Sequence, residues 1–147
     1  MLQHLRVFEG PPELALLLNE VFAVDVASVE GAQCEWAPDK TLHLNDRTAF
    51  DAFVIYRDPA GRRCFLAVET KYTEPFSQKE YDSQLYRDVT ARSGFFRDGA
   101  GEQLIGRSTN QLWRMAMLAA SLLHAGTSIS DRSRCWHLPM IATPALP

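Results

Sequence analysis

Cysteine is scarce in this sequence. Only three are found among 147 residues, and they lie far apart at Cys34, Cys64 and Cys135. Their number is odd and no two form a CxxC pair, so neither a zinc knuckle nor a disulfide framework is indicated. We therefore expect all three to be reduced packing residues, with Cys64 and Cys135 inside apolar runs.

Long apolar runs and phosphate-binding loops are also missing. No apolar run approaches the ~18 residues that cross a bilayer, and residues 1–10 lack the basic start and long apolar stretch of a signal peptide. A cytoplasmic protein is therefore the expectation. The glycines between positions 94 and 106 do not follow a predicted strand, which disfavours a sugar- or nucleotide-processing enzyme with a glycine-rich loop.

What is present is the composition of a soluble globular domain, with 46% hydrophobic and 22% charged residues. The net charge of −3 conceals an asymmetry, because residues 1–58 carry −6 and residues 59–147 carry +3. A basic later half is compatible with a nucleic-acid surface. Solvated helix faces also collect arginines, so both interpretations stay open.

The pattern of apolar residues predicts a mixed α/β domain built around a three-stranded meander. Residues 23–31 are ambiguous between a connecting turn and a short strand. Pro139 favours an edge position or a bulge in the last strand. The predicted elements are a helix at 11–22, strands at 32–38, 49–56 and 64–72, helices at 77–94 and 110–126, and a strand at 134–143.

The segment RDPAGRR, residues 57–63, predicts a tight turn between two strands, because Asp, Pro and Gly each favour chain reversal. If the turn is centred near Ala60, antiparallel pairs have residue numbers that sum to about 120. Asp51 then lies opposite Glu69. A shift of one residue in this register would turn the two carboxylates to opposite faces.

Glu69 and Lys71 share a face because side chains alternate along a strand. Two carboxylates that face each other repel unless a cation lies between them. Oxygen ligands of this kind suit Mg²⁺ or Mn²⁺. The alternative is an exposed ion pair of Glu69 with Lys71 or Lys79, worth ~0–1 kcal/mol, which leaves Asp51 unexplained.

Asp51, followed eighteen residues later by Glu69, Thr70 and Lys71 on the second arm of a hairpin, resembles the PD-(D/E)XK nuclease superfamily. The fold of that family is restriction-endonuclease-like: a helix, a three-stranded meander, a helix and a strand. The resemblance implies an α/β fold with a mixed four-stranded sheet flanked by helices. It also implies one nuclease-like domain over residues 1–147, either alone or within a longer chain.

The resemblance implies a role for each residue of the motif. Asp51 and Glu69 would ligate the metal together with the main-chain carbonyl of Thr70, whose side chain should point to the opposite face. Lys71 would position or activate the attacking water. Many members add a glutamate from the first helix, and Glu20 is the matching position, with a plain surface residue as the alternative.

Some subfamilies carry glutamine and tyrosine four residues apart on the later helix, but here Met115 stands four residues after Gln111. Gln111 and Arg114 are interpreted either as substrate contacts or as ordinary helix polarity. The implied function is a nuclease that hydrolyses DNA phosphodiester bonds with Mg²⁺, or Mn²⁺ as a substitute. A homodimer is compatible with this, because many such nucleases dimerise to cut both strands. The alternative is a non-catalytic nucleic-acid-binding or protein-interaction domain that retains the fold.

Overall fold

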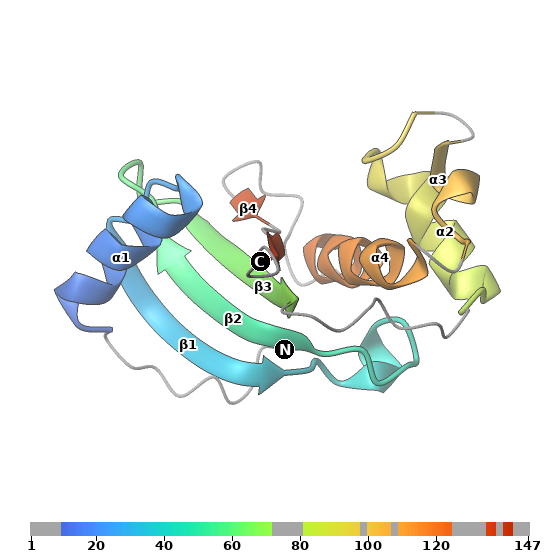
Figure 1. Ribbon diagram of the computed structural model, residues 1–147, viewed down its shortest axis with the longest axis horizontal. Helices are drawn as coiled ribbons and strands as arrows, with labels where there is room; N and C mark the ends of the chain where they lie inside the picture. Colours follow the sequence, from blue (N-terminus) through green and yellow to red (C-terminus); the bar gives the residue numbers. More distant parts are fainter. Residues whose placement is uncertain are drawn as a thin grey trace, which may run out of the picture. The chain divides into compact units, whose positions relative to one another are not determined.

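The computed structural model describes residues 10–71, 81–97, 100–106, 109–124, 135–137 and 140–142. Contacts divide the chain into two compact units (Figure 1). The first unit contains helix α1 and a β-sheet, and the second contains helices α2, α3 and α4. The predicted single domain over 1–147 stays a prediction.

The sheet of the first unit is a three-stranded antiparallel meander with short additions (Figure 1). Its strands are β1 (Ser28–Trp36), β2 (Phe50–Arg57) and β3 (Arg63–Lys71), in that spatial order. The short β4 (Cys135–His137) lies parallel to β3, and β5 (Met140–Ala142) also pairs with β3.

The predicted helix and meander are confirmed, and two strand predictions need correction. β1 begins four residues earlier than the predicted 32–38, because residues 28–31 join the ladder across a bulge between Val29 and Gly31. The single last strand predicted at 134–143 is divided into β4 and β5, so the predicted four-stranded sheet is not what forms.

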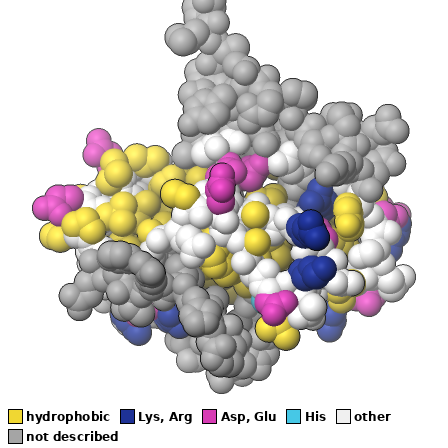
Figure 2. All heavy atoms as spheres, turned by 90° about the horizontal axis from the view of Figure 1, so that it is seen from below, with side chains coloured by type: hydrophobic (Ala, Val, Ile, Leu, Met, Phe, Trp, Pro, Cys, Tyr) yellow, Lys and Arg dark blue, Asp and Glu magenta, His cyan; other side chains and the backbone are white. Residues whose placement is uncertain are grey.

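Helix α1 (Pro12–Phe22) begins with a proline, which suits the first turn because its missing N–H has no partner there. Its buried face places Ala15 and Leu18 in one apolar cluster with Val54 and Leu66 of the sheet. The outer face is apolar as well: Leu16 is 70% exposed, and Figure 2 shows hydrophobic side chains gathered over α1.

The positions next to Val54 in β2 and Leu66 in β3 carry aromatic rings instead. Phe53 stacks on Trp36 with ring centroids 4.0 Å apart and on Phe65 at 5.2 Å. Because side chains alternate along each strand, these rings lie on the face opposite Val54 and Leu66. Both faces of the meander therefore carry apolar side chains.

The turn between β2 and β3 is held by Asp58. Its carboxylate accepts from the Arg62 amide at 2.8 Å and from Arg62 Nε at 2.6 Å, and its carbonyl accepts from the Gly61 amide at 2.9 Å. Burial disfavours ionisation of Asp58, but the bonds from Arg62 outweigh it and keep the pKa of this carboxyl below its ordinary value. The turn therefore fixes how β2 and β3 align.

Gly61 has a φ of +76°, in the left-handed region that disfavours side chains. We expect Gly61→Ala to lower the free energy of unfolding by about 1 kcal/mol, because a new Cβ meets no atom within 4 Å and only backbone strain is added. Urea denaturation measures this. The matched control is Gly106→Ala, where a Cβ also meets nothing but φ is not left-handed. Equal stability of the two variants would contradict the prediction.

The cysteine prediction needs correction. Cys64, buried in β3, is disulfide-bonded, whereas Cys34 is free and exposed on β1. The expectation of three reduced cysteines is therefore wrong for Cys64. Spacing along the sequence did not reveal this, because a disulfide depends on strand pairing, which in β3 and β4 aligns Cys64 with Cys135.

The second unit is helical. The amide of Tyr86 is capped by the Ser83 side chain, so α2 (Gln84–Ser93) begins later than the predicted 77, and it ends at the left-handed Gly94 as predicted. Helix α4 (Asn110–His124) is confirmed, while the predicted cap Gly126 lies outside the described residues. The region expected to be loop contains the short α3 (Ala100–Gln103).

Within the described residues, no helix combines the length and apolarity needed to cross a membrane.

A buried polar network, which we call the Asp46 cluster, joins Asp46, Thr48, Tyr86 and Arg114. Asp46 accepts hydrogen bonds from the Thr48 amide at 2.8 Å, from the Thr48 hydroxyl at 2.8 Å and from the Tyr86 hydroxyl. Arg114 donates to the Thr48 hydroxyl at 2.6 Å, and its Nε lies 3.7 Å from Asp46. Burial and the bond to Asp46 raise the pKa of Tyr86, so its hydroxyl stays a donor.

Candidate metal and nuclease site

The register of the β2–β3 hairpin bears on whether the carboxylates of Asp51 and Glu69 can meet. Every pair from Arg57 and Arg63 to Ala52 and Val68 has residue numbers that sum to 120, as predicted. The predicted register is therefore confirmed as far as Ala52 and Val68. Continued by one residue, it would place Asp51 opposite Glu69, and that pairing stays a prediction.

Asp51 is exposed, and one of its two carboxylate oxygens is bonded to Thr70. Its Oδ2 accepts from the Thr70 amide at 2.6 Å and from the Thr70 hydroxyl at 2.7 Å. Among the described residues, Oδ1 accepts no hydrogen bond. The expectation that the Thr70 side chain points away is wrong, because its hydroxyl reaches across to Asp51.

Glu69 is only 4% exposed. A glutamate is rarely buried to this degree, and acidic groups held in such environments concentrate at functional sites. Glu69 thus differs sharply in burial from Asp51, which is exposed. Lys71 is the last residue of β3, and its side chain lies outside the part of the chain that the structure describes.

The third predicted carboxylate, Glu20, is exposed on α1. Over the described residues, no group of three or more His, Cys, Asp or Glu side chains is arranged to hold a metal ion. The metal role of Glu20 stays a prediction. The remaining donors still fit Mg²⁺. This ion commonly binds through one or two carboxylates and keeps several waters.

The two predicted substrate contacts lie on α4, in the second unit. Gln111 is half-buried. The side chain of Arg114 is 14% exposed, and its guanidinium also lies 5.0 Å from the centre of the Tyr81 ring. The Asp46 cluster thus gives Arg114 a role inside its own unit. Sequence reasoning missed this role, because its partners are far away in a polar segment without periodicity.

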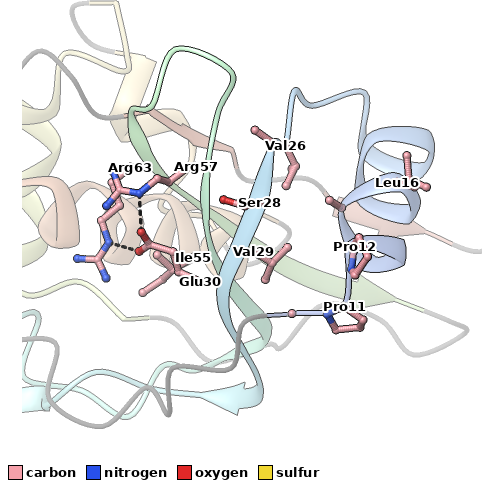
Figure 3. A pocket seen from close by; sticks show the side chains of 13 residues that line it. Pro11, Pro12, Leu16, Val26, Ser28, Val29, Glu30, Ile55, Arg57 and Arg63 are labelled. Carbon is pink, nitrogen blue, oxygen red and sulfur yellow. Dashed lines mark hydrogen bonds and ion pairs between the residues drawn. The ribbon is translucent and has the colours of Figure 1, made fainter.

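A separate hollow lies at the other end of the hairpin. It is a groove of about 930 Å³ between the start of α1 and the first residues of β1 (Figure 3). Glu30 lies there between two arginines, 2.8 Å from Arg57 Nε and 2.7 Å from Arg63 Nε. Neither Asp51 nor Glu69 lines this groove, so the hollow and the carboxylate pair are distinct features.

The family model of the PD-(D/E)XK nuclease superfamily matches residues 8–139. The match covers most of the chain, including the whole meander and α4, and the chain belongs to this superfamily. Comparisons with the curated proteins and with the solved structures found no match. The assignment of the chain to this superfamily therefore rests on the family model.

Proposed function

We propose that this protein is a Mg²⁺-dependent nuclease that hydrolyses DNA phosphodiester bonds. The observation that supports the proposal is the hairpin register, which holds as far as Ala52 and Val68. Continued by one residue, it would set Asp51 opposite Glu69, two residues before Lys71 on β3. Membership of a superfamily of nucleases supports the same reaction class. Mn²⁺ would serve as a substitute ion.

The residues that would hold the ion are Asp51 and Glu69, together with the main-chain carbonyl of Thr70. Asp51 fits this role because Oδ1 accepts no bond among the described residues. A bound Mg²⁺ would supply positive charge to the phosphate and lower the pKa of a water.

Lys71 would hold the attacking water. It lies two residues after Glu69, and alternation along a strand predicts that the two side chains share a face. An ammonium group there would position the water by donating one hydrogen bond to its oxygen, whereas a neutral amine would accept the proton that the water loses as it attacks phosphorus. Gln111 stays a prediction for substrate contact. Arg114 also stays a predicted contact, although its bonds within the Asp46 cluster already account for its position.

Lys71→Ala tests whether Lys71 acts on the attacking water and not on the metal ion. We expect the rate of DNA cleavage to fall by about 10²–10⁴-fold, the usual contribution of a group that manages proton transfer. The affinity for Mn²⁺ should stay close to that of the parent protein, because lysine is not a metal ligand. Cleavage of a mixture of duplex and single-stranded DNA and titration calorimetry measure the two quantities.

The control for Lys71→Ala is Lys40→Ala, the same change at an exposed lysine of the 3-10 helix Lys40–Leu42. Equal cleavage by both variants would remove Lys71 from the proposal. Glu20→Gln decides the ligand set: unchanged Mn²⁺ affinity assigns the ion to Asp51 and Glu69 without Glu20. Absence of divalent-ion binding by the unmodified protein would instead favour the non-catalytic binding domain.

A further inference from the structure

Thr70 makes an unusual contact at the end of the β2–β3 ladder. The last backbone pair is Ala52 with Val68, and beyond it Thr70 is bonded to a side chain. The amide and the hydroxyl of Thr70 both donate to one oxygen, Oδ2 of Asp51, at 2.6 and 2.7 Å. The two strands are therefore joined here by the Asp51 carboxylate.

Two donors on one oxygen restrict how a carboxylate can turn. Hydrogen bonds to an ionised acceptor are shorter and stronger than neutral ones. The donors also come from a residue with little freedom, since a threonine side chain is stiff about χ1 and the amide belongs to the strand. Asp51, although exposed, is thereby held with Oδ2 engaged and Oδ1 accepting no bond among the described residues.

We infer that the hydroxyl of Thr70 is a positioning group, which holds Asp51 so that a single oxygen is presented to a divalent cation. The inference rests on the proposed function and gives Thr70 a second role besides its main-chain carbonyl. It makes Asp51 a ligand through Oδ1 alone. It also gives a chemical reason for threonine between Glu69 and Lys71, where the main-chain carbonyl alone would accept many residue types.

A purely structural role makes different predictions. Asp51 is exposed, so losing one of its two hydrogen bonds costs little stability, because water replaces the missing donor. If the bond only stabilises the fold, its loss should leave the affinity for the metal ion unchanged. Loss of a group that orients a metal ligand typically weakens metal binding by about 10–100-fold. Metal affinity therefore separates the two roles where thermal stability does not.

The test compares Thr70→Val with Thr70→Ser. Valine keeps the branched shape and the amide bond but removes the hydroxyl, whereas serine keeps the hydroxyl. We expect Thr70→Val to weaken Mn²⁺ binding by about 10–100-fold in titration calorimetry, and Thr70→Ser to restore most of it. The cleavage rate at saturating Mn²⁺ should recover at least in part in Thr70→Val, because extra ion offsets a misplaced ligand. A circular dichroism melt confirms that each variant is folded.

The outcomes separate this inference from the proposed function. If Asp51→Asn loses Mn²⁺ binding while Thr70→Val binds like the parent, the positioning role is overturned and the metal site stands. Equal losses in Thr70→Val and Thr70→Ser also overturn it, because the hydroxyl would then not be the cause. If the unmodified protein binds no divalent ion, both fail. If Thr70→Val does not fold, Thr70→Ala takes its place in the same comparison with serine.

Discussion

Asp51→Asn should lower the rate of Mg²⁺-dependent DNA cleavage by about 10³-fold, the scale seen when one preorganised electrostatic group is removed. Asparagine has the shape of aspartate, and its amide oxygen can still accept from Thr70, so the hairpin should persist. What is lost is the negative charge that would bind the ion. The affinity for Mn²⁺ should fall together with the rate, which distinguishes Asp51 from Lys71.

The matched control for this variant is Asp25→Asn, the same change at an exposed carboxylate between α1 and β1. Its cleavage and Mn²⁺ affinity should equal those of the parent protein. Single-turnover cleavage with Mg²⁺, repeated with a chelator, gives the metal-dependent rate for each protein. If Asp51→Asn cleaves as fast as Asp25→Asn, Asp51 is not a ligand and the proposed site is wrong.

Asp46→Ala should lower the free energy of unfolding by about 3–5 kcal/mol, the usual cost of leaving a buried charge without its partner. Asp46 accepts three hydrogen bonds and is the acidic neighbour of the largely buried Arg114. Alanine removes all of these interactions. Within the part of the chain that the structure describes, Arg114 Nε has no hydrogen-bond partner even in the intact cluster, and the bond to Thr48 and the contact with the Tyr81 ring bring no formal negative charge to replace the lost carboxylate.

The control for Asp46→Ala is Asp82→Ala in the same unit. Like Asp46, Asp82 lies beside an arginine. It accepts two hydrogen bonds from Arg87, at 2.6 and 2.7 Å, but both side chains are well exposed. An exposed pair of this kind contributes only ~0–1 kcal/mol. Urea denaturation followed by circular dichroism compares the two variants. Similar losses in both would show that burial of the Asp46 cluster does not determine its contribution.

The hairpin could be predicted from the sequence because its causes are local. Asp58, Pro59 and Gly61 specify a tight turn, and antiparallel pairing then determines what lies opposite Asp51. Predicting this register needs no knowledge of distant residues. The same holds for the end of α2, which Gly94 marks by adopting a left-handed conformation.

Other features depend on contacts that local patterns do not encode. Alternation of side chains predicts that Thr70 faces away from Asp51, but the regular ladder ends before Thr70, and its hydroxyl bonds to the carboxylate. Arg114 looks like any polar helix residue until Asp46 and Thr48, more than sixty positions earlier, are placed beside it. Such partners can be assigned only from the folded chain.

The alignment of β2 and β3 has a consequence for how this hairpin can change in evolution. Paired positions have residue numbers that sum to 120, so the numbers of two partners always differ by an even number. With the turn unchanged, the strands can grow or shrink only by matched additions, one residue on each arm, if Asp51 and Glu69 are to stay opposite. An unmatched deletion in β3 alone would preserve every proposed site residue and still separate the two carboxylates. The spacing between the two arms therefore decides whether the two carboxylates can lie opposite each other, whatever side chains stand between them.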